Sequence, residues 1–185
     1  MKRKLAVALV HYPIVDAQGD IVTTAVTNLD IHDIARSART FGCSDYFIVH
    51  PIEAQRALVN RICEHWTTGS GARRIPDRKK ALELVRIVST LEEAIERLGE
   101  GGPVETWVTA ARDVATPISF EQARESLSQS GPPVLLIFGT GWGLAKSVIE
   151  SATAALPPIR IAGSDFNHLS VRAAAAIMLD RLGSV

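Results

Sequence analysis

Apolar runs alternate with amphipathic stretches along the whole chain. Apolar residues without a helical spacing predict strands at 5–12, 46–49, 82–88, 104–110, 134–138 and 159–162. Apolar residues at helical spacing predict helices over 28–40, 51–65, 91–98, 145–155 and 169–182. Because strands and helices alternate, we expect an α/β domain with a mainly parallel sheet covered by helices on both faces.

Polar residues at the helix starts indicate where several helices begin. Thr27 or Asn28 can cap the first helix, and the segments at 90–93 and 119–122 have the spacing of capping boxes. Gly42 is placed to end the first helix. The Gly- and Ser-containing stretch at 67–77 predicts a mobile loop rather than a domain boundary.

The bulk composition is that of one globular domain over residues 1–185. The chain is 46% hydrophobic and 22% charged, which is enough apolar material for a full core. Twenty basic and twenty acidic residues cancel, and this balance argues against an indiscriminate nucleic-acid coat while allowing a local basic patch. Cys43 and Cys63 have no CxxC spacing, so we expect free thiols in a cytoplasmic protein. We expect no membrane partner and no metal, because the sequence has neither a long apolar span nor a Cys/His cluster.

A glycine-rich segment follows the apolar run at 134–138. Gly139, Gly141 and Gly143 let the backbone turn sharply and approach a ligand closely, just before a predicted helix. A dinucleotide fingerprint would need GxGxxG, and here the spacing is one residue too short. A phosphate-binding P-loop would need GK[ST] directly afterwards, which is absent from the sequence.

A second polar loop, at 162–171, precedes a helix with an alanine run at 173–176. The start of this helix leaves free backbone N–H groups, and its small side chains allow close packing. If both loops close the ends of adjacent strands, they form one pocket for a small molecule.

These segments resemble a known family. Residues 135–144 and 168–177 are similar to the two C-terminal motifs of the SPOUT methyltransferases, and residues 27–43 are similar to their first motif. The resemblance is closest to stand-alone predicted RNA methyltransferases related to the tRNA guanine-N1 enzymes. It implies a C-terminal trefoil knot (the α/β-knot fold), S-adenosylmethionine as cofactor, RNA and in particular tRNA as substrate, and a homodimer.

The resemblance also assigns residues to roles. It implies a cofactor site made by Thr109, Gly139, Thr140, Gly141, Trp142, Gly143, Leu144, Ile161, Leu169 and Ser170. It places Arg36 at the arginine that contacts the target nucleotide, which makes Arg36 the candidate catalytic residue. An arginine is a poor base because of its high pKa, so orienting phosphate or stabilising developing charge is the simpler role. The alternative for Arg36 is a surface ion pair with Asp30 or Asp33.

Other features narrow the chemistry. Asp30 and Ser170 stand where the ribose-methylating branch has asparagines, so base methylation stays open. Asp165 and His168 are candidate proton acceptors or helix caps. A dense basic patch could grip RNA phosphates or simply be a solvated charge run; it consists of Arg73, Arg74, Arg78, Lys79 and Lys80.

Three functions therefore remain at the level of sequence. The leading one is an S-adenosylmethionine-dependent RNA methyltransferase. The second is a non-catalytic knot protein that binds RNA or the cofactor, and the third is a dinucleotide-binding oxidoreductase.

Overall fold

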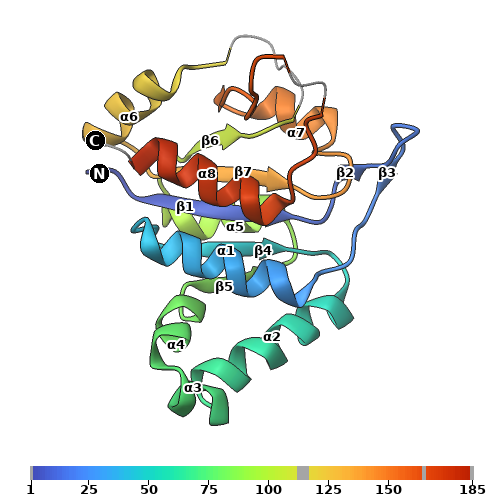
Figure 1. Cartoon of the computed structure of the whole chain (residues 1–185), viewed down its shortest axis with the longest axis vertical. Coiled ribbons are helices and arrows are strands. Elements are labelled where there is room, and N and C mark those ends of the chain that lie inside the picture. Colours follow the sequence, from blue (N-terminus) through green and yellow to red (C-terminus); the bar gives the residue numbers. More distant parts are fainter. Residues whose placement is uncertain (1, 112–116, 164–165, 184–185) are drawn as a thin grey trace.

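In the computed structural model, which describes residues 2–111, 117–163 and 166–183, a parallel sheet runs through the centre (Figure 1). Its strands follow the order β5-β4-β1-β7-β6-β8, and every pairing between them is parallel. The sheet strands are β1 (Leu5–Val10), β4 (Tyr46–Val49), β5 (Val85–Val88), β6 (Glu105–Val108), β7 (Val134–Gly139) and β8 (Ala154–Ala155). A separate antiparallel hairpin joins β2 (Ile14–Val15) to β3 (Ile21–Val22). The predicted α/β class with a parallel sheet is confirmed.

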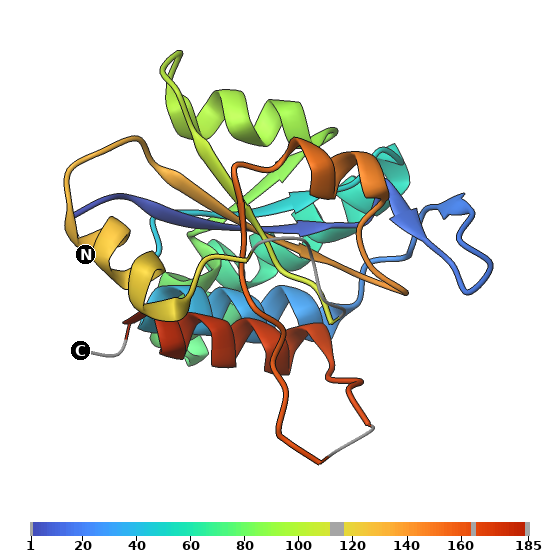
Figure 2. The same cartoon turned by 90° about the horizontal axis from the view of Figure 1, so that it is seen from above.

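Helices cover both faces of this sheet (Figure 2). The helices are α1 (Asn28–Thr40), α2 (Glu53–Thr67), α3 (Ser70–Arg74), α4 (Pro76–Leu82), α5 (Leu91–Gly99), α6 (Phe120–Ser128), α7 (Lys146–Ser151) and α8 (Val171–Gly183). One face packs against α1, α6 and α8, and the other packs against α5 and α7. Helices α2 to α4 extend beyond the β5 edge (Figure 1).

The two central strands are buried on both faces, which explains their unbroken apolar sequences. In β1, Leu5, Val7 and Leu9 enter the core beneath α1 and α8. Ala6 and Ala8, between them, enter the second core beneath α5 and α7. Side chains that alternate between two buried faces must all be apolar, as is typical of a central parallel strand.

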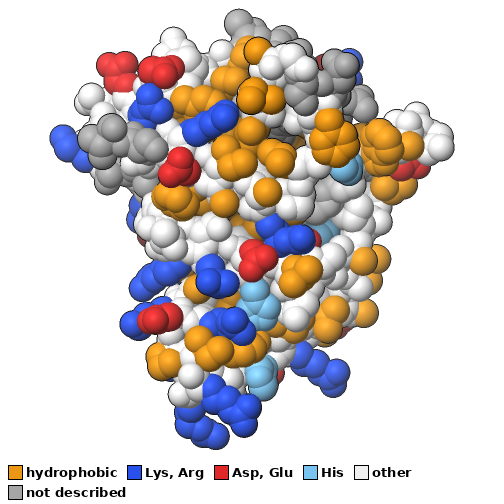
Figure 3. Space-filling view, in the orientation of Figure 1, with side chains coloured by type: hydrophobic (Ala, Val, Ile, Leu, Met, Phe, Trp, Pro, Cys, Tyr) orange, Lys and Arg blue, Asp and Glu red, His pale blue; other side chains and the backbone are white. Residues whose placement is uncertain are grey.

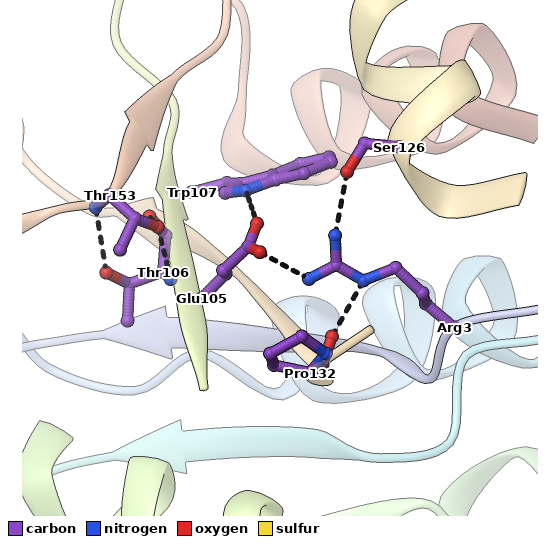
Figure 4. Close-up of polar contacts among 7 residues, drawn as sticks. All are labelled: Arg3, Glu105, Thr106, Trp107, Ser126, Pro132 and Thr153. Atoms are coloured by element: carbon purple, nitrogen blue, oxygen red, sulfur yellow. Dashed lines mark hydrogen bonds and ion pairs between the residues drawn. The ribbon is translucent and has the colours of Figure 1, made fainter. Parts of the chain in front are cut away.

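A buried arginine ties together the edge of the sheet where the strands begin (Figure 4). Arg3 forms a 2.8 Å ion pair with Glu105, and its Nη1 donates to Ser126 Oγ at 2.7 Å. Its Nε donates to the carbonyl of Pro132 at 2.7 Å, while Trp107 Nε1 donates to Glu105 at 3.3 Å. The cluster therefore joins the starts of β1 and β6 to α6 and to the turn before β7. Trp107 is buried, as predicted.

The predicted strand at 159–162 is wrong. The last strand is β8, at Ala154–Ala155, where Leu156 N donates to the carbonyl of Val108 at 2.9 Å. Pro157 and Pro158 follow directly, and a proline has no N–H with which to continue a ladder. The helix predicted over 145–155 accordingly stops at Ser151, and the chain is extended before β8.

Two further local predictions need correction. The stretch predicted as a mobile loop, 67–77, holds α3 and the start of α4, and Pro76 occupies the first turn of α4. At α5, Thr90 Oγ1 accepts from Glu93 N, but the Glu93 carboxylate accepts from Ser89 rather than from the cap residue. The box at Ser119 and Gln122 is complete, as predicted.

Both cysteines are free thiols, as predicted. Burial raises the pKa of Cys43 to about 12 and that of Cys63 to about 11, so both stay protonated and poorly nucleophilic. Among the described residues, no helix combines the length and the apolar character that crossing a bilayer requires.

Candidate functional site

Neighbouring strands β1 and β7 lead to helices on opposite faces of the sheet. Helix α1, after β1, packs on one face, whereas α7, after β7, packs on the other. The two connections therefore diverge from the carboxyl ends of adjacent strands, which is the usual place for a ligand in open parallel sheets. The segment Gly139–Leu144, called the glycine loop below, leaves β7 at this point.

Two glycines of this loop have left-handed backbones, for different reasons. Gly141 has φ +56°, and a Cβ there would lie 3.2 Å from Ile14 Cγ2 and 3.3 Å from Thr24 Cγ2. A glycine at position 141 therefore lets the loop pack closely against Ile14 of β2 and Thr24 beyond β3. Gly143 has φ +114°, and a Cβ there would meet no described atom within 4 Å, so its bare backbone faces open space.

The loop after β6 contacts strand β7 and the loop after β8. Thr109 donates through Oγ1 to the carbonyl of Ile137 in β7 at 3.1 Å. Beyond it, the carbonyl of Ala111 accepts from Asn167 Nδ2 at 2.7 Å and from Arg160 Nη2 at 3.2 Å. The three loops follow the neighbouring strands β7, β6 and β8, so β7 and β8 are not adjacent as expected but lie on either side of β6. The shared pocket stays a prediction.

The predicted cofactor residues divide into exposed and buried groups. The side chains of Trp142, Ile161 and Leu169 are 59%, 76% and 45% exposed, so they offer apolar surface at this edge. Ile161 lies in irregular backbone and not on a strand, which corrects the premise of its assignment. Leu144 is buried in the core, so only its backbone can face a ligand. Ser170 Oγ accepts from Ala173 N at 3.3 Å and caps α8.

An ion-pair cluster joins the starts of α1 and α8. Arg172 Nη1 lies 2.7 Å from Asp30 Oδ1, and its Nε lies 3.5 Å from Asp33 Oδ2. These aspartates are therefore paired with Arg172, and the alternative that paired them with Arg36 is wrong. No local sequence pattern indicated this contact, because 142 positions separate Arg172 from Asp30.

Arg36 lies away from the glycine loop of its own chain. It is exposed in the third turn of α1, about 12 Å along the helix axis from Asn28 at the usual rise per residue. A hollow between α1 and α4 contains its side chain; this basic hollow is lined by Arg36, Arg39, Thr40, Ile75, Asp77, Arg78, Lys80 and Ala81.

The predicted RNA-binding residues lie on α3 and α4 beside that hollow. Arg78 and Lys80 line it directly, whereas Arg73 and Arg74 are exposed on α3. Arg78 is held with its guanidinium 4.3 Å from the centre of the Trp66 ring. Lys and Arg side chains gather over this lower part of the molecule in Figure 3. The structure thus places Arg36 with the basic patch rather than with the cofactor loops.

The structure describes one of the two candidate proton acceptors, His168. His168 is exposed, and its ring meets that of Phe166 edge-on with centroids 6.3 Å apart. Asp165 lies outside the described residues, and its role stays a prediction.

Two buried histidines at the same edge were not singled out from the sequence. His11 follows β1 and His50 follows β4, with ring centroids 5.3 Å apart. Burial, and then the neighbouring His50, lower the pKa of His11 to about 4. The only sequence signal was a histidine at the end of each of two apolar runs.

Comparison with known proteins shows the family of this chain. A family described as "SAM-dependent RNA methyltransferase" matches residues 4–184. A tRNA (guanine-N(1)-)-methyltransferase of Oleidesulfovibrio alaskensis is 47% identical over 97% of this chain, but this chain spans only 42% of that protein. An uncharacterized protein of Aquifex aeolicus is 40% identical over 96% of this chain and 87% of its own length.

A solved structure establishes the likeness of fold. TrmJ from Z. mobilis matches with a TM-score of 0.64 and 16% identity over 99% of this chain and 69% of that chain. The α/β fold expected from the resemblance to the SPOUT methyltransferases is confirmed, while the trefoil knot stays a prediction. Because the family match covers nearly the whole chain, the dinucleotide-dependent oxidoreductase is not favoured. The chain belongs to the family of S-adenosylmethionine-dependent RNA methyltransferases.

Proposed function

We propose that this chain methylates tRNA, with the methyl donor held at the glycine loop and the RNA held at the basic hollow. The observation that carries the proposal is the glycine loop at the carboxyl ends of the paired strands β1 and β7, in a chain that the methyltransferase family matches from residue 4 to 184. The tRNA is taken from the relatives, of which the chain spans less than half.

The residues at this edge are suited to S-adenosylmethionine. The open side of Gly143 gives a ligand access to bare backbone, and the exposed side chains of Trp142, Ile161 and Leu169 provide apolar surface for an adenine ring. Thr109, in the loop after β6, is held beside β7 by its hydrogen bond to the carbonyl of Ile137. When bound, the cofactor supplies a methyl group that is already activated, so the protein has mainly to position donor and acceptor.

The basic hollow is suited to an RNA backbone. Four of its lining residues are cationic and one, Asp77, is anionic. Asp77 forms a 3.2 Å ion pair with Lys80, whereas no described group pairs with Arg36 or Arg39. Two neighbouring guanidinium groups without a carboxylate partner are available for phosphate oxygens, which they can contact through paired N–H donors.

We further propose a cytoplasmic homodimer. Within one chain Arg36 is well separated from the glycine loop, so a second copy is the simplest way to bring an Arg36 near a cofactor site. Sedimentation of the protein at micromolar concentration tests this point, and a monomer at all concentrations would contradict it.

Methyl transfer from radiolabelled S-adenosylmethionine to bulk tRNA tests the main proposal. We expect incorporation with the wild-type chain and a loss of at least about tenfold in Arg36→Ala, with calorimetric cofactor affinity unchanged. Arg97→Ala is the matched control, because Arg97 is an exposed arginine on α5, on the opposite face, paired with Glu93 at 2.6 Å. Absence of any cofactor binding by the wild type would refute the proposal.

A further inference from the structure

Three residues from distant segments form a chain of hydrogen bonds beneath the glycine loop. His11 follows β1, Thr24 follows the β2–β3 hairpin, and Thr140 belongs to the glycine loop after β7. His11 Nδ1 lies 3.0 Å from Thr24 Oγ1, which is hydrogen-bonded to Thr140 Oγ1. Thr140 Oγ1 lies 3.2 Å from the carbonyl of Val10. We call this chain the hydroxyl relay.

Counting protons fixes the direction of the relay. A carbonyl oxygen can only accept, so Thr140 must donate its single hydroxyl proton to Val10. Thr140 then accepts from Thr24, and Thr24 in turn accepts from the ring of His11. His11 therefore carries its proton on Nδ1 and presents a bare lone pair on Nε2.

The other ring nitrogen supports this assignment. The side chain of His11 is fully buried, and its Nε2 has no hydrogen-bond partner among the described residues. A buried N–H without an acceptor would cost more than a bare lone pair in the same place. Because burial lowers the pKa of His11 to about 4, the ring stays neutral and the direction of the relay holds at neutral pH.

Residues 13–15 also hold the glycine loop through backbone hydrogen bonds. Val15 N donates to Gly143 O at 2.9 Å, Trp142 N donates to Val15 O at 3.2 Å, and Ala145 N donates to Pro13 O at 3.1 Å. These bonds hold the outer half of the loop. Near its start, Thr140 is the residue whose side chain joins the loop to the interior, through the relay.

We propose that His11 is a positioning residue for the methyl-donor site: through its Nδ1–H it orients the hydroxyl relay that holds Thr140, and with it the glycine loop, in the cofactor-binding conformation. This inference rests on the proposed placement of the cofactor at the glycine loop. It assigns a role to a histidine that does not itself have to touch the ligand.

Two substitutions at His11 distinguish its hydrogen bond to Thr24 from its role in filling space in the core. Asparagine places an amide N–H near the position of Nδ1 and can still donate to Thr24. Glutamine fills the site but places its amide nearer to the position of Nε2, so the donor to Thr24 is lost. A second pair leaves the buried histidine intact: Thr140→Ser keeps the hydroxyl, and Thr140→Val removes it with little change in shape.

The measurement has two arms. The first follows amide hydrogen exchange of residues 140–143 in the protein without any ligand, and the second measures S-adenosylmethionine affinity by calorimetry. We expect His11→Gln and Thr140→Val to accelerate amide exchange in the loop and to weaken cofactor binding about tenfold. A tenfold change is the size expected for the loss of one buried hydrogen bond. We expect His11→Asn to stay within about threefold of the wild type in both arms, and Thr140→Ser to do so in the exchange arm.

The two arms distinguish this inference from the proposed function. If the wild type binds no S-adenosylmethionine, the proposed function fails, and with it the cofactor role of the relay, while the exchange arm still reports whether His11 holds the loop. The relay is overturned if His11→Asn and His11→Gln give the same exchange rates for residues 140–143, and Thr140→Ser and Thr140→Val also give the same rates. If exchange responds as expected and affinity does not, the role of His11 in the cofactor site is overturned.

Discussion

Acidification should destabilise this protein through His11. The unfolded chain leaves a histidine with a pKa near 6.5, whereas burial and the facing His50 lower the pKa of His11 to about 4 in the folded state. The facing carboxylate of Asp30 and the hydrogen bond to Thr24 oppose this shift but do not cancel it. At pH values between these two pKa values, His11 binds a proton in the unfolded state but not in the folded state. The free energy of unfolding therefore falls as the pH falls.

The expected magnitude follows from the size of the shift. Each pKa unit corresponds to about 1.4 kcal/mol, so the full effect would be about 3 kcal/mol below pH 4. At about pH 5 the difference from about pH 7.5 is about 2 kcal/mol, because His11 is still neutral in the folded state there. The side chain is fully buried, so screening by solvent does not reduce this effect much.

Urea unfolding followed by circular dichroism measures the effect. The wild type is compared with His11→Asn, which does not titrate and retains the donor to Thr24. Carboxylates titrate in both proteins, so the change in the difference between their free energies of unfolding, from about pH 7.5 to about pH 5, isolates His11. Parallel pH profiles for the two proteins would refute the reasoning.

Other predictions concern the loop, the hollow and the far edge of the sheet. Gly141→Ala should lower the free energy of unfolding by about 1–2 kcal/mol, because its backbone is left-handed and its Cβ would crowd Ile14; unchanged urea unfolding would contradict this. For Arg36→Ala we expect a smaller dependence of tRNA affinity on salt concentration, measured by filter binding, because one phosphate contact is lost; an identical salt slope would remove Arg36 from the RNA interface. Arg3→Met should cost about 3 kcal/mol, because it leaves Glu105 without its partner, and a thermal midpoint equal to that of the wild type would show that the cluster adds nothing.

The fold class could be predicted from local patterns because it depends on alternation. The runs in β1 and β7 are apolar at every position, which is the signature of strands buried on both faces. The last strand could not be placed in this way, because Pro157 and Pro158 end the ladder just before the run at 159–162 that was predicted as that strand. The short β8 has only two residues, too few for any periodicity.

Only the loops of the candidate site could be predicted from the sequence, and not the side-chain contacts that hold them. The glycines after β7 and the polar loop before α8 are visible in the sequence because they are continuous segments. The contacts that hold them join residues that are far apart: Thr24 meets Thr140 across 116 positions, and Arg172 meets Asp30 across 142. No local pattern encodes such pairs.

The sequence by itself therefore determined the layered α/β architecture, the glycine loop and the resemblance to a methyltransferase family, since each depends on neighbours along the chain. Only the tertiary structure decided that Arg36 lies in the basic hollow, that Arg172 holds Asp30, and that His11 stands beneath the glycine loop. Parallel strands bring their carboxyl ends to one edge whatever their separation in sequence, and that edge is where polar side chains from distant segments meet.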